Sequence, residues 1–143
     1  MGKEIFEAIR KRVEEEPYAK KMGLVLVEVD SGYSLVEMEF TEDMENVFGM
    51  AHGGAIFSLI DEAFEVASNS HGTVSVAPSM SVTYVSSPKK GDTLLAEGRE
   101  VSRSNRVATY SIQVKTDKGD LIAICQALVY RKRDPLPFLQ GNR

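Results

Sequence analysis

The sequence predicts an α+β protein in which one long, strongly apolar helix is covered by an antiparallel β-sheet. A helical pattern runs from Gly53-Gly54 to His71-Gly72, and its nonpolar residues fill an arc of roughly 200°. That arc is much wider than a surface helix needs, so the helix must be covered on most sides. Two strand-like segments precede the helix and four follow it, and these segments supply the cover.

The other elements follow from hydrophobic periodicity and turn residues. A nonpolar stripe predicts an amphipathic first helix over Lys3–Glu16, which Pro17 ends. We expect a connector over Tyr18–Gly23, a loop over Thr41–Ala51 and an irregular tail over Arg131–Arg143. The predicted strands are Leu24–Asp30, Tyr33–Phe40, Val74–Ser87, Thr93–Arg103, Arg106–Thr116 and Leu121–Arg131. The last strand is apolar on both faces, which places it inside the sheet.

Length and composition exclude several classes of protein. The 143 residues predict a single domain over residues 1–143, and 43% hydrophobic with 27% charged residues is typical of a soluble globular protein. A net charge of -4 argues against a general nucleic-acid binder. The single cysteine, Cys125, excludes an internal disulfide, and no apolar run reaches membrane-spanning length. Because the start of the chain is too charged for a signal peptide, we expect a cytoplasmic protein without membrane contact.

The polar side of the central helix carries the first candidate site residue, Asp61. Asp61 falls at the edge of the polar arc, where desolvation and a neighbouring acid can raise the pKa of a carboxyl group. The alternative is that Asp61 is an ordinary solvated helix acid. The arc itself is expected to hold Ser58, Glu62, Glu65 and Asn69.

The start of the central helix is the second candidate feature. His52-Gly53-Gly54 precedes the apolar pattern, and the first turn of a helix has free N–H groups at the positive end of its dipole. Such a turn can bind an anion or an oxyanion. The alternative for His52 is a capping or loop histidine.

The spacing of these two features predicts a site shared between two copies of the chain. Gly53 and Asp61 are eight positions apart, which is about 12 Å along a helix. One carbonyl group cannot lie on the helix start and also within about 3 Å of Asp61 of the same chain. An antiparallel pair of helices about a two-fold axis brings each Asp61 to the other chain's Gly53.

The residue pattern around the central helix resembles that of a known protein family. Asn46, His52-Gly53-Gly54, Asp61 and Asn69-Ser70 stand as they do in hotdog-fold thioesterases of the phenylacetic-acid-degradation type. The resemblance spans about residues 18–131, outside which lie the first helix and the tail. The resemblance implies a hotdog fold in which two protomers pair, and tetramers of such dimers are common in the family. It also implies hydrolysis of acyl-coenzyme A thioesters at the dimer interface. Weaker matches follow at Tyr84, Pro88, Gly91-Asp92, Tyr110, Gly119 and Tyr130.

The favoured mechanism assigns a role to each site residue. The N–H of Gly53 or Gly54 binds the thioester oxygen, and Asp61 of the partner subunit acts as general base on water or attacks directly. Asn46 orients the water or the carboxylate, and His52 either donates to the thioester oxygen or fixes the turn. No separate cofactor is expected, because coenzyme A enters with the substrate. The candidates for binding its phosphates are Lys89, Lys90, Arg103 and Arg106, for which solubilising surface charge is the alternative.

Other chemistries find less support. Ser58 lacks a G-x-S-x-G motif, and His52 and His71 are too far apart to share a metal ion, so no metal site is expected. Two alternatives remain on the same fold. One is a non-catalytic acyl-coenzyme A sensor or scaffold, which would not need the acid at Asp61. The other is a hotdog dehydratase, for which only His52 is available as the base. The acyl group is not determined. We expect a small or medium, aryl or aliphatic group, and Phe57, Phe64 and Val47 are candidates to line its pocket.

Overall fold

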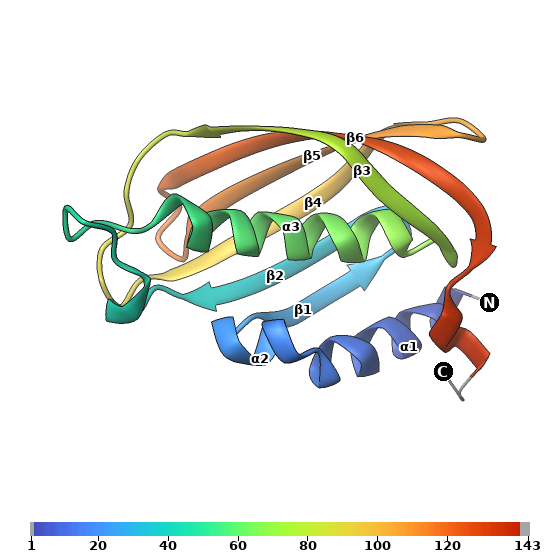
Figure 1. The fold of residues 1–143 in the computed structure, drawn as a ribbon, viewed down its shortest axis with the longest axis horizontal. Coiled ribbons are helices and arrows are strands. Elements are labelled where there is room, and N and C mark those ends of the chain that lie inside the picture. The colour runs from blue at the N-terminus through green and yellow to red at the C-terminus, as the bar shows by residue number, and fades with distance from the viewer. Residues whose placement is uncertain (1, 141–143) are drawn as a thin grey trace.

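Six antiparallel strands form one curved sheet, and the helix α3 lies across its concave side (Figure 1). The structure is a computed structural model that describes residues 2–140. The helices are α1 (Gly2–Glu15), α2 (Pro17–Met22) and α3 (Gly53–Asn69), with 3-10 turns η1 (Glu42–Met44) and η2 (Pro137–Gln140). The strands are β1 (Val25–Asp30), β2 (Tyr33–Glu39), β3 (Thr73–Tyr84), β4 (Thr93–Arg103), β5 (Val107–Thr116) and β6 (Leu121–Pro135).

The strands are ordered β1-β2-β4-β5-β6-β3, and α3 connects β2 to β3 at the opposite edge. Among the described residues, β3 therefore has one edge without a partner strand. Pro78 lies in this edge strand, where the pairing of β3 with β6 is irregular between Val76 and Ser79. A proline cannot donate to a ladder and is tolerated at such an edge or bulge. A long unpaired edge is also a template for pairing with a second chain.

Small residues let α3 approach the sheet closely. Ala63 and Ala67 are fully buried on α3, and opposite them lies Gly98 of β4. A Cβ atom on Gly98 would lie only 3.1 Å from the Ala63 carbonyl oxygen. The buried Ser34 hydroxyl of β2 donates to the same oxygen at 2.5 Å. The helix is thus held against β2 and β4 by close packing and one buried hydrogen bond.

The terminal segments pack beside this core at one end of the molecule (Figure 1). Ile9 and Val13 of α1 are buried, and Arg10 Nη1 donates to the Leu26 carbonyl of β1 at 3.0 Å. The Arg12 guanidinium lies 6.0 Å from the centre of the Phe138 ring in η2, within the range of a cation–π contact. α1 is therefore part of the packed structure.

The predicted α+β class, element order and central helix are confirmed. The interior position of the last strand is also confirmed, since β6 lies between β5 and β3. The outward side chains Ile124, Leu128 and Tyr130 of β6 remain exposed in the single chain. No helix within residues 2–140 is long and apolar enough to cross a membrane.

Three predicted segments need correction. The expected connector over Tyr18–Gly23 is mostly α2, because Pro17 restarts a helix at its first position, where the missing N–H costs nothing. The tail is not irregular after Arg131: β6 continues to Pro135, and η2 follows. That extension pairs Thr73 with Pro135. The end of the predicted tail, residues 141–143, lies outside the described residues. β3 also ends at Tyr84, three residues before the predicted Ser87.

Candidate functional site

His52 caps the start of α3 and occupies one of its two glycine amides. The His52 Nδ1 atom accepts a hydrogen bond from the Gly54 N–H at 2.8 Å. Because Nδ1 is an acceptor, the neutral imidazole carries its proton on Nε2 and presents a donor there. Within residues 2–140 the Gly53 N–H has no hydrogen-bond partner. Gly53 is therefore the amide left free at the positive end of the α3 dipole.

Tyr84, at the end of β3, lies directly against this turn. Its hydroxyl donates to the Gly53 carbonyl at 3.1 Å, and its ring would lie 3.3 Å from a Cβ atom on Gly53. Tyr84 is half exposed. No local pattern predicts this contact, because Tyr84 stands thirty-one positions after Gly53 and only the sheet brings the two residues together.

Asn46 organises the loop before α3. Its Oδ1 atom accepts from the Phe48 and Met50 N–H groups at 2.8 and 3.1 Å. Its backbone N–H also donates to the Met50 carbonyl at 2.7 Å. The loop consequently presents Phe48 and its neighbour Val47 to solvent, 81% and 92% exposed. Asn46 shapes the loop before Gly53, and within residues 2–140 no hydrogen bond joins its side chain to Asp61.

Asp61 lies on the open side of α3, on the rim of a groove of about 500 Å³ between α3, α1 and β3. It is exposed in the single chain, yet desolvation on its groove side raises the pKa of its carboxyl group, and repulsion from Glu16 adds to this. Of the three residues predicted to line an acyl pocket, Phe64 lines this groove, whereas Phe57 and Val47 do not. The groove walls are mainly nonpolar, with Val13, Val74, Met80 and Phe138 among them.

The polar arc of α3 is not uniformly solvated, which corrects the prediction for two of its residues. Glu62 is only 3% exposed and Ser58 is 8% exposed, because α2 and the residue before it cover them. The Ser58 hydroxyl donates to the Gly54 carbonyl at 2.9 Å and therefore accepts from the Tyr18 hydroxyl at 2.7 Å. With both roles used, Ser58 is a structural residue and not an activated nucleophile.

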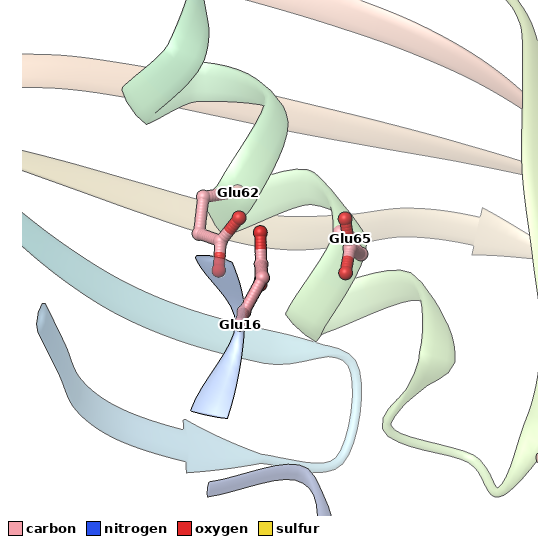
Figure 2. A group of neighbouring side chains, drawn as sticks. All are labelled: Glu16, Glu62 and Glu65. Atoms are coloured by element: carbon pink, nitrogen blue, oxygen red, sulfur yellow. The ribbon is translucent and has the colours of Figure 1, made fainter. Parts of the chain in front are cut away.

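Three glutamates lie near Asp61, and one of them, Glu16, raises the pKa of its carboxyl group. Glu16 stands between α1 and α2, and Glu62 and Glu65 follow Asp61 on α3. Figure 2 shows the three glutamate side chains next to one another. Desolvation, contact with Glu16 and repulsion from the other acids raise the pKa of Glu62 strongly. Desolvation and repulsion from Glu16 and Asp61 raise the pKa of Glu65 to about 7. The sequence predicted a neighbouring acid at Glu65 but missed Glu16, which is distant along the chain.

The four basic residues proposed for phosphate binding do not form one site. Lys90 lies 4.0 and 3.9 Å from Glu42 and Glu45, and Arg103 lies beside Glu100 and His71. Lys89 lines a separate polar pocket near the end of β3. Arg106 instead joins a basic pocket of about 420 Å³ with Arg131, Lys132 and Arg133. The grouping around Arg106 was missed because the tail was expected to be irregular.

A curved antiparallel sheet wrapped around one long helix, with a capped glycine turn at the helix start and an acid two turns on, defines the hotdog class of proteins. The comparisons with known proteins are in accord with this class. Residues 48–123 match the thioesterase superfamily. The chain belongs to that superfamily and is a PaaI-like, hotdog-fold thioester hydrolase.

Individual relatives cover most of the chain. A putative esterase of Archaeoglobus fulgidus is 41% identical over 112 residues, which is 78% of this chain and 73% of that protein. The acyl-coenzyme A thioesterase PaaI of Escherichia coli is 30% identical over 82% of this chain and 84% of its own length. The structure of E. coli PaaI superposes with a TM-score of 0.89 over 94% of this chain and 97% of that one, at 26% identity. A Streptococcus mutans protein in complex with acetyl-CoA matches with a TM-score of 0.75 at 28% identity, over 79% of this chain and 91% of that one.

Proposed function

We propose that this protein hydrolyses acyl-coenzyme A thioesters at a site built from two copies of the chain. The observation that carries the proposal is the pair of features on α3: a free Gly53 N–H at its start and the Asp61 carboxylate on its open side. They are about 12 Å apart along the helix, too far to act on one carbonyl group from one chain. Relatives that are acyl-coenzyme A thioesterases, and the relative in complex with acetyl-CoA, support this substrate class.

The unpartnered surfaces around the site support the pairing of two chains. The long strand β3 has an open edge, and the loop after Asn46 exposes Val47, Phe48 and Met50 beside Gly53. A nonpolar loop tip next to an unpaired strand is stabilised when a second chain covers both. We expect at least a dimer and favour a tetramer.

In the proposed reaction, the thioester oxygen accepts a hydrogen bond from the Gly53 N–H of one subunit. The helix dipole and the Nε2–H of His52 add to the positive potential there, which stabilises the oxyanion as it forms. Asp61 of the partner subunit activates water or attacks the carbonyl carbon, and the coenzyme A thiolate leaves. Oxygen-18 from labelled water would appear in Asp61 after one turnover only if the carboxylate attacks directly.

The groove beside Asp61 is the proposed acyl site. Its nonpolar walls and its volume of about 500 Å³ fit an aryl or medium-length aliphatic group. Arg106 and the basic residues near it are the remaining candidates for the coenzyme A phosphates. The tautomer of His52 argues against a dehydratase, since a base must accept a proton and the solvent-facing Nε2 already carries one.

Thiol release from a panel of acyl-coenzyme A esters tests the proposal. The wild-type protein should prefer medium-length or aryl esters over acetyl-coenzyme A. Asp61→Asn keeps the shape of the side chain and removes its basicity, so kcat should fall by about 10²-fold or more. The oligomer should remain intact by light scattering. Near-wild-type thiol release from this variant would leave Asp61 as an ordinary helix acid and favour the non-catalytic sensor.

A further inference from the structure

Three carboxylates that the proposed reaction does not use meet between the first helices and α3. Glu16 lies at the junction of α1 and α2, and Glu62 and Glu65 lie one turn apart on α3. One carboxylate oxygen from each residue lies within 4.8 Å of the other two. In Figure 2 the tip of Glu16 points between the two α3 side chains. We call these residues the acid cluster.

Glu62 is the unusual member of the acid cluster. Its side chain is 3% exposed, and its buried Oε2 atom has no hydrogen-bond partner. Buried carboxylate oxygens are normally satisfied by donors, because an unpaired one carries the full cost of desolvation. Its neighbour is instead a second acid, Glu16, which can pair with the Glu62 carboxyl group only through a shared proton or a bound cation. Within residues 2–140, the buried Glu62 carboxyl group therefore has an acid beside it and no ion-pair partner.

No basic side chain supplies that partner. Among the ion pairs within residues 2–140, none involves the acid cluster or Asp61. Arg12 is placed one turn before Glu16 on α1 but lies over the Phe138 ring. These acids thus have no ion-pair partner in the described part of the chain, where Arg12 is the one basic residue that lines the groove with Glu16 and Glu65.

We propose that the acid cluster binds a divalent cation that prefers oxygen ligands, such as Ca²⁺ or Mn²⁺. Oxygens on opposite sides of a Ca²⁺ ion are separated by roughly 5 Å, since each bond is 2.3–2.6 Å long. The mutual separations of at most 4.8 Å in the acid cluster fall inside that limit. Glu16 and Glu65 also line the groove, which gives the ion a path from solvent and leaves room for coordinating water.

A bound cation would change the surroundings of the groove in two ways. It would tie the α1–α2 junction to α3 through Glu16, and it would offset negative charge beside Asp61. The second effect matters only if the proposed function holds, because coenzyme A carries phosphates that the free acids repel. Cation binding itself does not depend on that function and is measured without any substrate.

The test uses the EDTA-treated oligomer, titrated with Ca²⁺ by calorimetry and with Mn²⁺ by electron paramagnetic resonance. We expect one ion per subunit with a Kd on the order of 10⁻⁵ to 10⁻³ M. Glu62→Gln and Glu16→Gln should each weaken binding by at least about tenfold. Glu15→Gln is the matched control, since it removes an exposed acid next to the cluster and should bind the ion as the wild type does.

Thermal unfolding with and without Ca²⁺ gives a second readout. The wild type and Glu15→Gln should unfold at a higher temperature with Ca²⁺, and Glu16→Gln should not. Glu16 is only half-buried, so its variant is useful even if Glu62→Gln fails to fold. No saturable binding at millimolar cation, or equal binding by Glu16→Gln and the control, would overturn the proposal. A stability that depends on pH and on Glu62 but not on cation would show that Glu16 and Glu62 share a proton instead.

Discussion

Mixing two inactive variants tests whether the site is shared between chains. One variant carries Asp61→Asn and lacks the base. The other carries Gly53→Pro, which deletes the free N–H but suits the first helical position, where proline is well tolerated. Each variant alone should lose about 10²-fold in kcat or more, since the base and the oxyanion donor each contribute on that scale.

A mixed dimer contains one complete site. That site takes Gly53 from the Asp61→Asn chain and Asp61 from the Gly53→Pro chain, while its other site carries both lesions. Random mixing in equal amounts makes about half of the dimers mixed, so about a quarter of the wild-type sites should be restored. Mixed dimers purified through two different tags should recover about half of the wild-type kcat per dimer.

Gly53→Ala is the matched control for the backbone change. It adds the same Cβ atom, 3.3 Å from the half-exposed Tyr84 ring, and keeps the N–H. It should retain most activity, whereas Gly53→Pro should not, and both should show native circular dichroism. If both variants fold and mixing restores nothing, acid and amide act within one chain and the reasoning from helix spacing is wrong.

Three further outcomes are expected. Light scattering at micromolar concentration should show at least a dimer, and an active wild-type monomer would contradict this expectation. Phe48→Ser should weaken the dimer, because it removes an exposed nonpolar side chain. Gly98→Ala should lower the free energy of unfolding by about 1–3 kcal/mol in denaturant titrations, because its Cβ would lie 3.1 Å from the Ala63 carbonyl oxygen. Cys125 is buried, and desolvation raises the pKa of its thiol to about 11. A disulfide reagent at pH 8 should therefore label Cys125 only after the protein unfolds. Fast labelling of the folded protein would contradict this and show that β6 opens.

Local patterns predicted much of this fold. The wide nonpolar arc of α3, the proline after α1 and the short turns between strands act over a few residues, so periodicity and turn chemistry reveal them. α2 was missed because the six residues from Pro17 to Met22 are too few to show a helical period. The continuation of β6 past Arg131 was missed because its pairing with the start of β3 is nonlocal and its residues are mostly polar.

Only the part of the candidate site that lies on α3 could be predicted from the sequence. Helical geometry alone relates Gly53 to Asp61. The contacts of Tyr84 with Gly53 and of Glu16 with Glu62 join segments that are more than thirty positions apart. The burial of Glu62 could not be read from the helix pattern, because the cover comes from residues around Pro17. A helical wheel shows which residues share a face but not which distant segment packs on it.

The glycine pair at the start of α3 has two separate physical roles. Gly54 makes room for the His52 cap, since a Cβ atom there would lie 3.1 Å from His52 Nδ1. Gly53 makes room for the Tyr84 ring, which packs against the same turn. The approaching groups belong to the same chain, so the pair is needed for close packing more than for flexibility. Because His52 takes the Gly54 amide, the turn presents a single free N–H, held between two fixed side chains. A donor held in this way needs little reorganisation as charge develops on a thioester oxygen, which is the condition for strong electrostatic stabilisation of a transition state.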